Sequence, residues 1–136
     1  MQNRRNFLAS ATLLGLSTTA TALPTMETND KPVLVHHVFF WLKNASSKED
    51  QTKLIEGVNT LRKIETLKML RVGIPAATEK RPVVDHSYQV SLLAFFDDLA
   101  GQSIYQKHPV HLKFIENYSH LWERVVVYDS MDDDTA

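Results

Sequence analysis

The sequence contains no cysteine among its 136 residues. The chain therefore has no disulfide, no thiol nucleophile and no thiolate ligand for a metal, and its stability must come from packing alone. Internal repeats and low-complexity tracts are also missing beyond the N-terminal segment. No apolar run approaches the roughly 20 residues that a membrane-spanning helix needs. These absences leave a small packed domain as the expected architecture.

Positive charge is in short supply as well. The chain has 15 Lys and Arg residues against 16 Asp and Glu residues. Removing residues 1–22 takes away Arg4 and Arg5 and no acidic residue, which leaves 13 basic against 16 acidic residues, a net charge of −3. Binding to phosphates requires a positive surface, so this balance argues against a nucleic-acid partner.

The first 22 residues have the pattern of an export signal. Arg4-Arg5 is followed by Phe7-Leu8, by a weakly apolar stretch over residues 9–16, and by Ala20-Thr21-Ala22. A charged start, a short apolar stretch and a small-residue cleavage site predict a twin-arginine signal peptide that is cleaved after Ala22. We therefore expect an exported, periplasmic or otherwise extracytoplasmic protein without stable membrane insertion. The alternative interpretation is an N-terminal helix packed on the domain.

The rest of the chain divides into a linker, one domain and a short tail. Residues 23–32 are polar and contain two prolines, which is typical of a flexible linker. Residues 33–130 have the size of one ordinary domain. Residues 131–136 carry three consecutive aspartates and are expected to be a solvated acidic tail. A domain this small has a limited core, and dimerisation is a common remedy.

The domain reads as four strands and two helical regions. β-branched and aromatic residues or loose alternation predict strands over 33–42, 67–76, 87–96 and 123–130. Ser46 with Glu49, or Ser47 with Asp50, forms a capping-box pattern at the start of an amphipathic helix that runs to about Thr66. Residues 77–85 are expected to form a loop.

The second helical region is expected to be interrupted by a proline. Asp97-Asp98 caps a helix that continues through Tyr105, and a further helical piece follows from Pro109 to about residue 122. The order β-α-β-β-α-β predicts an α+β ferredoxin-like fold with a four-stranded sheet. Phe39, Phe40 and Trp41 are consecutive, so at least one of them points away from the helices. A second copy of the same sheet is the economical cover for that face, which predicts a homodimer through the sheet face.

Three segments resemble the stress-responsive A/B barrel (Dabb) domain family. They are residues 35–43 (VHHVFFWLK), residues 105–111 with Tyr105 and the sequence His108-Pro109-Val110-His111, and residues 121–129 (LWERVVVYD). The segments follow the family order, and the resemblance covers residues 33–130. It implies a dimeric α+β barrel in which two ferredoxin-like sheets pack face to face.

The sequence His108-Pro109-Val110-His111 is the sharpest chemical pattern in the chain. Two histidines three residues apart on a helix share a face, and Tyr105 lies three residues before the first of them. A neutral histidine is a suitable general base, and tyrosine can donate a hydrogen bond to a developing oxyanion. The segments are also similar to those of a plant polyketide cyclase, and this resemblance implies catalytic roles for His111 and Tyr105. In the alternative interpretation, His108 and His111 only cap and hydrogen-bond the last helix.

His36 and His37 lie in the first strand and must face opposite ways. The resemblance implies that His37 points into the cavity near His111. We predict ligand binding by His37, His108, Trp41 and Tyr88, in a mainly apolar cavity that suits a small hydrophobic or aromatic molecule. A histidine in an apolar strand is alternatively a hydrogen-bonded core group.

A metal site is the second chemical idea for the same histidines. His37, His108 and His111 offer three nitrogens, with Asp129 or Glu123 as a carboxylate. The chain has no tightly spaced metal motif such as H-E-x-x-H, so we expect neither a metal nor a cofactor. A haem-dependent or oxygen-dependent activity has no strong signal in the sequence.

Two kinds of function therefore remain open. The first is a ligand-binding barrel without catalysis. The second is a small cofactor-independent cyclase, lyase or isomerase that uses His111 as general base and Tyr105 as oxyanion donor. The two differ in what surrounds His111. An enzyme needs an imidazole that faces a cavity beside Tyr105, whereas a purely structural histidine has all its hydrogen bonds made and no adjacent void.

Overall fold

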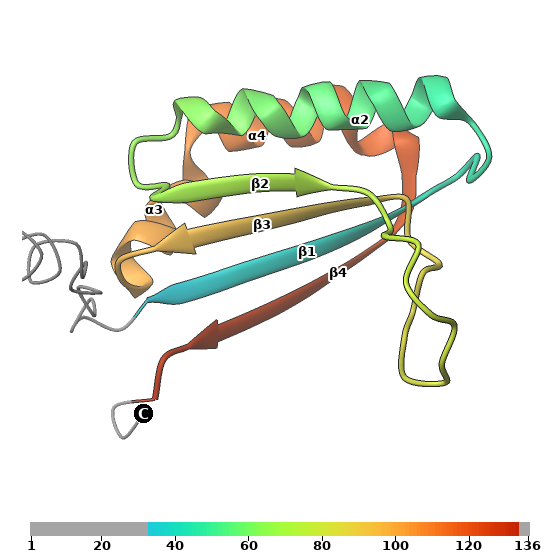
Figure 1. Ribbon diagram of the computed structural model, residues 1–136. Helices are drawn as coiled ribbons and strands as arrows, with labels where there is room; N and C mark the ends of the chain where they lie inside the picture. The colour runs from blue at the N-terminus through green and yellow to red at the C-terminus, as the bar shows by residue number, and fades with distance from the viewer. Residues whose placement is uncertain (1–32, 134–136) are drawn as a thin grey trace, which may run out of the picture. The chain divides into compact units, whose positions relative to one another are not determined.

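The computed structural model describes residues 33–133. The predicted signal peptide, the predicted linker and residues 134–136 lie outside the described residues. Within the described part, four strands and three helices follow the predicted order (Figure 1). They are β1 (Leu34–Leu42), α2 (Lys48–Thr60), β2 (Met69–Gly73), β3 (Val90–Phe96), α3 (Leu99–Lys107), α4 (Pro109–Tyr118) and β4 (Trp122–Met131), with short 3-10 turns at Leu61–Lys63 and Ser119–Leu121.

The strands form one sheet in the order β2-β3-β1-β4, and every neighbouring pair is antiparallel. β3 therefore lies between β1 and β2, which are joined by α2 in a split β-α-β unit. This topology confirms the predicted α+β ferredoxin-like fold. The strands are close to their predicted limits, although β2 is shorter than the predicted range of 67–76.

The helix starts follow the predicted capping residues. The Ser47 hydroxyl accepts a hydrogen bond from the Asp50 amide at 3.1 Å, which selects the second of the two capping patterns. The Asp98 carboxylate accepts from the Gly101 amide at 2.8 Å. Pro109 occupies the first position of α4, where no hydrogen bond from its nitrogen is required. Local side chains therefore fix where each helix begins.

The core lies between the sheet and the helices. Figure 1 shows α2 and α4 on one side of the sheet, and the two helices contact each other. Burial alternates along β1 and β3, so that every second side chain enters the core. The helix layer contributes a further set of buried apolar residues: Leu54, Val58, Leu61, Ile64, Tyr105 and Phe114. Each fully buried Leu, Val or Phe stabilises the fold by about 1.5–3 kcal/mol relative to an exposed one.

The opposite face of the sheet carries no helix in the described part of the chain (Figure 1). Phe39 and Trp41 are half-buried on this open face. The Phe39 ring lies 4.9 Å from that of Tyr88 and 6.1 Å from that of Tyr128, measured between centroids. The Arg124 guanidinium lies 4.4 Å from the centroid of the Trp41 ring, in a cation–π contact. The open face is thus an aromatic surface, as the three consecutive aromatic residues in β1 predicted.

The helix layer leaves β4 incompletely covered. Val125 and Val127 pair directly with Phe40 and Val38, whose side chains are buried on the helix side. The two valines are nevertheless 38% and 45% exposed. A gap therefore opens on the helix side of the sheet along β4. Separately, no helix among residues 33–133 is long and apolar enough to cross a membrane.

Candidate functional site

A cavity of about 250 Å³ lies between the sheet and the α3–α4 region. Most of its lining is apolar and includes Val38, Leu92, Phe114 and Trp122. The polar side chains that line it are His36, Tyr105, Gln106 and His111. An apolar cavity with a few grouped polar side chains is the usual form of a small-molecule site.

His36 is held in the cavity by a carboxylate on the neighbouring strand. It pairs directly with Asp129 across β1 and β4, and its Nδ1 lies 2.6 Å from Asp129 Oδ1. The His36 residue is 5% exposed, whereas the Asp129 side chain is 51% exposed. A carboxylate is an acceptor only, so His36 donates through Nδ1–H, and its Nε2 is left as the basic nitrogen. The pair therefore fixes both the ring orientation and the tautomer of His36.

His111 faces the same cavity with one hydrogen-bonding atom unsatisfied. It lies in the first turn of α4 and is 7% exposed, and its Nδ1 is buried without a hydrogen-bond partner. Burial lowers the pKa of His111 below its ordinary value and outweighs the opposing effect of a contact with the Gln106 backbone, so the imidazole is neutral near pH 7. The neutral imidazole lines the cavity, so it can accept a proton or a hydrogen bond from a molecule bound there.

Tyr105 lies between the two histidines. Its ring centroid is 4.8 Å from that of His111 and 5.7 Å from that of His36. The residue is 1% exposed, and burial strongly raises its pKa. The phenol therefore keeps its proton at neutral pH and can act as a hydrogen-bond donor. Tyr105 and His111 come together because α3 ends and α4 begins at a single residue, His108.

His108 itself performs the capping role. Its Nδ1 accepts a hydrogen bond from the Val110 amide at 3.1 Å, and its Nε2 lies 3.3 Å from a carboxylate oxygen of Glu65. It is absent from the cavity lining. The structure thus confirms the capping interpretation of His108 and places it outside the site for which we predicted it.

The predicted location of His37 is wrong. Its neighbour His36 enters the cavity with His111, and His37 packs against Phe39 on the open face, with ring centroids 4.3 Å apart. Alternation along β1 requires this, because Leu34, Val38 and Leu42 face the core and His36 is in phase with them. Burial lowers the pKa of His37, and the nearby His36 adds to the effect.

Trp41 and Tyr88 accompany His37 on the open face. They line a separate hollow of about 130 Å³ together with Phe39, Asp85 and Tyr128. Tyr88 is in phase with the buried residues Val90 and Leu92 of β3, so unbroken alternation would place it on the helix side. A bend at Gln89, just before the strand begins, breaks the alternation and turns Tyr88 to the other side. Three of the four predicted ligand-binding residues therefore lie on the open face and His108 lines neither hollow, whereas the predicted catalytic residues Tyr105 and His111 line the helix-side cavity.

The predicted alternative of a three-histidine metal site is not supported. His37 lies on the far side of the sheet from His111, and His108 is occupied by capping. Within residues 33–133, no three His, Asp or Glu side chains are grouped closely enough to hold a metal ion. Asp129, considered there as a metal ligand, is instead the partner of His36.

Residues 34–132 match the stress-responsive A/B barrel (Dabb) domain. The chain belongs to this family. A search among curated proteins finds no significant match. Fifty-five chains of known structure match, and all those described below are less than 25% identical, so they show the shared fold alone.

Three of these structures illustrate the fold. A Dabb family protein with a ferredoxin-like fold from Mesorhizobium loti is 22% identical, with a TM-score of 0.60, over 74% of this chain and 96% of that one. A hydroxynitrile lyase from Passiflora edulis is 20% identical, with a TM-score of 0.59, over 76% and 96%. A dimeric ferredoxin-like protein of unknown function from Thermobifida fusca is 16% identical, with a TM-score of 0.59, over 79% and 97%.

Proposed function

We propose that this Dabb protein is a cofactor-independent enzyme that moves a proton on a small, mainly apolar carbonyl compound bound in the helix-side cavity. One observation carries the proposal: His111 presents a buried, unpaired nitrogen beside Tyr105 in an apolar cavity that also contains His36. A purely structural histidine would have its hydrogen bonds made and no void next to it. The reaction class is cyclase, lyase or isomerase.

The chemistry follows from the two protonation states. Neutral His111 takes a proton from the carbon next to the carbonyl group and becomes an imidazolium, while the electron pair moves onto the carbonyl oxygen. The phenol of Tyr105 donates a hydrogen bond to that developing oxyanion. The imidazolium then returns its proton to the product, which restores the enzyme.

His36 and Asp129 form a second proton-transfer unit in the same cavity. The carboxylate holds Nδ1–H, so Nε2 of His36 is available to a ligand, in the way that an acidic partner orients a catalytic histidine. We assign His36 as the group that exchanges a proton at a second atom of the substrate, apart from the carbon that His111 deprotonates. Asp129 is the residue that positions it.

Ligand binding without catalysis is the second candidate, and the largely apolar lining favours it. The two candidates are separated by incubating the mature protein with a panel of small aliphatic and aromatic ketones and aldehydes in D₂O. Deuterium incorporation next to the carbonyl group, followed by NMR, reports enolisation without knowledge of the final product.

We expect His111→Gln to slow exchange by about 10²–10⁴-fold, and Tyr105→Phe to slow it by about 10²–10³-fold. His37→Gln is the matched control on the open face and should leave the rate close to that of the parent. Exchange that is insensitive to His111→Gln would refute the proposed role of this residue. Compounds that bind without any exchange would establish the binding function instead. A hydroxynitrile lyase has the same fold, so the fold is compatible with lyase chemistry.

We further propose that two copies pair through the open face. The aromatic surface around Phe39 and Trp41 supports this, as does the dimeric state of relatives with the same fold. Sedimentation of the mature protein should give twice the monomer mass, and Phe39→Asp should give the monomer mass. A monomeric parent protein would overturn this part of the proposal.

Export by the twin-arginine route is the last part of the proposal. The Arg4-Arg5 pattern supports it, and the lack of cysteine is compatible with folding before transport. Cell fractionation should find the mature protein outside the cytoplasm, and replacing both arginines by lysine should retain the precursor inside. Unchanged export of that variant would contradict the twin-arginine route.

A further inference from the structure

A further hollow in the described part of the molecule lies between the end of α2 and α4. It has a volume of about 410 Å³ and is bounded by Thr60 and Lys63 on one side and by α4 on the other. It is separate from the helix-side cavity, although Phe114 lines both. We refer to it as the α2–α4 groove.

The floor of the α2–α4 groove is apolar and held in place by packing. It includes Val110, Phe114 and Tyr118. The Tyr118 ring stacks on Phe114 with a centroid distance of 5.7 Å and an interplanar angle of 26°. The Tyr118 ring also packs against Gly57 of α2. A Cβ atom at position 57 would lie only 2.7 Å from the Tyr118 ring. The floor therefore exists before any ligand arrives.

Two lysines stand at opposite walls of the groove. Lys63 comes from the 3-10 turn after α2 and has no ion pair among residues 33–133. Lys113 comes from α4, and its nearest carboxylate oxygen, on Glu116, is 3.9 Å away. No acidic residue lines the groove, and Thr60 and Asn117 add a hydroxyl and an amide. The groove thus combines an apolar floor with two ammonium groups and no carboxylate.

We propose that the α2–α4 groove binds a small organic carboxylate with an apolar body. The apolar floor contacts the body, and the ammonium groups of Lys63 and Lys113 donate hydrogen bonds to the carboxylate. The mainly apolar lining favours an anion with an apolar body over free phosphate, which has none. This site is independent of the proton-transfer function proposed above.

Titration of the mature protein with sodium octanoate, followed by ¹H–¹⁵N NMR, tests the proposal. We expect the largest shift changes at Thr60, Val110 and Asn117. The double variant Lys63→Gln/Lys113→Gln should weaken binding on the order of tenfold, as expected for two partly exposed charge contacts. The matched control Lys43→Gln/Lys80→Gln removes the same charge elsewhere and should bind octanoate like the parent.

Two further measurements distinguish the contribution of the ligand's carboxylate from that of the shape of the groove. Octan-1-ol has the same body without the carboxylate, and it should bind more weakly than octanoate at low salt. Thr60→Phe fills the groove without changing its charge and should abolish the shifts.

Equal binding of alcohol and carboxylate, or of the parent and the lysine variant, would overturn the proposal. Shifts centred on Val38 and Val127 would also overturn it, because they would place octanoate in the helix-side cavity. Failure here leaves the enolisation assay unaffected, since that assay reports on His111 at a different place.

Discussion

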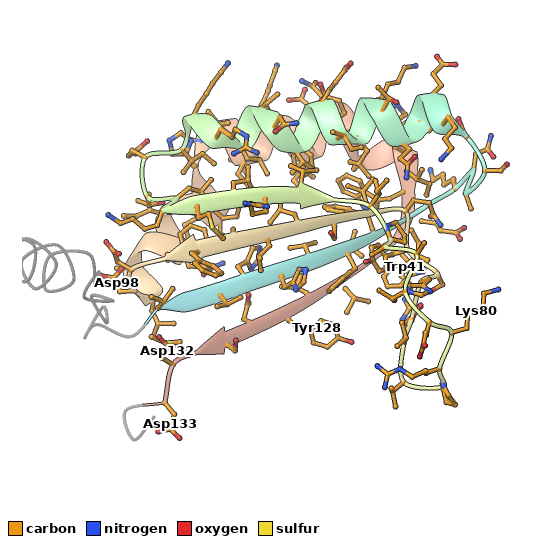
Figure 2. All side chains as sticks on the ribbon, in the orientation of Figure 1. Trp41, Lys80, Asp98, Tyr128, Asp132 and Asp133 are labelled. Carbon is orange, nitrogen blue, oxygen red and sulfur yellow. The ribbon has the colours of Figure 1, made fainter. Side chains whose placement is uncertain are left out.

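The two faces of the sheet place the same type of side chain in different surroundings. His36 and His37 are neighbours in β1, yet one is buried beside Tyr105 and bonded to Asp129, and the other packs on Phe39 at the open face. The helix-covered face holds the packed core and, beside β4, a cavity with a small polar cluster. The open face is an aromatic surface on which Trp41 is half-buried and Tyr128 is exposed, and Figure 2 shows both residues there.

The difference teaches that surroundings rather than residue type decide what a histidine can do here. His36 gains a carboxylate partner through strand pairing, and His111 gains an apolar pocket through helix packing. His37 gains only ring contacts. The four predictions below test this contrast, in order of decreasing effect.

The largest effect is expected for core truncation on the covered face. Phe96 is fully buried, so Phe96→Ala should lower the free energy of unfolding by about 3–5 kcal/mol through lost burial and a new cavity. Phe39→Ala on the open face should cost much less in the monomer. Chemical denaturation at two protein concentrations measures both, because a loss of pairing makes the Phe39 effect depend on concentration. Equal losses at both sites would show that the open face is as tightly packed as the core.

A smaller effect is expected for the carboxylate that holds His36. Asp129→Asn keeps the shape but removes the negative charge, and should lower the free energy of unfolding by about 1 kcal/mol, given the partial exposure of Asp129. Asp97→Asn, which breaks the exposed pair with Lys68, is the control and should change it by less. If Asp129→Asn also leaves proton exchange on a bound ketone unchanged, the positioning role of Asp129 is excluded.

The cation–π contact on the open face should contribute less still. Arg124→Gln removes the guanidinium over Trp41 and should cost about 0.5–1 kcal/mol. Thermal unfolding of this variant beside Trp41→Phe, alone and combined, isolates the pair energy. Additive effects of the two substitutions would mean that the contact contributes nothing to stability.

The smallest effect is a pH dependence of stability. The folded-state pKa of His111 lies below its ordinary value of about 6.5, so in the interval between them the unfolded chain binds more protons than the folded one. Stability is therefore complete above about pH 6.5 and decreases as the pH falls towards the folded-state pKa. Melting curves between about pH 5 and pH 8 should be flatter for His111→Gln than for the parent. His37→Gln should flatten them less, because His37 is more exposed.

Most of the fold could be predicted from the sequence. β-branched and aromatic residues mark β1, alternating apolar residues mark β3, and Ser47, Asp98 and Pro109 set the helix starts, because these signals act over a few residues. The open face was also predictable, from three consecutive aromatic residues in one strand. The bend at Gln89 could not be predicted, since no glycine or proline marks it. The orientation of Tyr88 depends on this bend and could not be predicted either.

The site was harder to predict, because it depends on register between distant segments. The sequence brings Tyr105 and His111 together through the short α3–α4 junction, and the structure places them side by side. Alternation in β1 requires His36 and His37 to face opposite ways, but both sides of the strand are apolar, so the pattern leaves their order open. The His36–Asp129 pair needs the alignment of β1 with β4, which is 93 residues away. An acidic residue directly after the apolar run of residues 125–128 was the available signal for Asp129.

A single peptide unit, between His36 and His37, separates the cavity from the aromatic surface. Adding or deleting one residue in β1 would exchange the two compartments at once, turning Phe39 and Trp41 inward and His36 outward. Residues 74–89 connect β2 to β3 outside the sheet, and Val83 there is 82% exposed. This protein should therefore accept insertions of varied length in that connection and none in its first strand, a boundary for engineering that an insertion library would map directly.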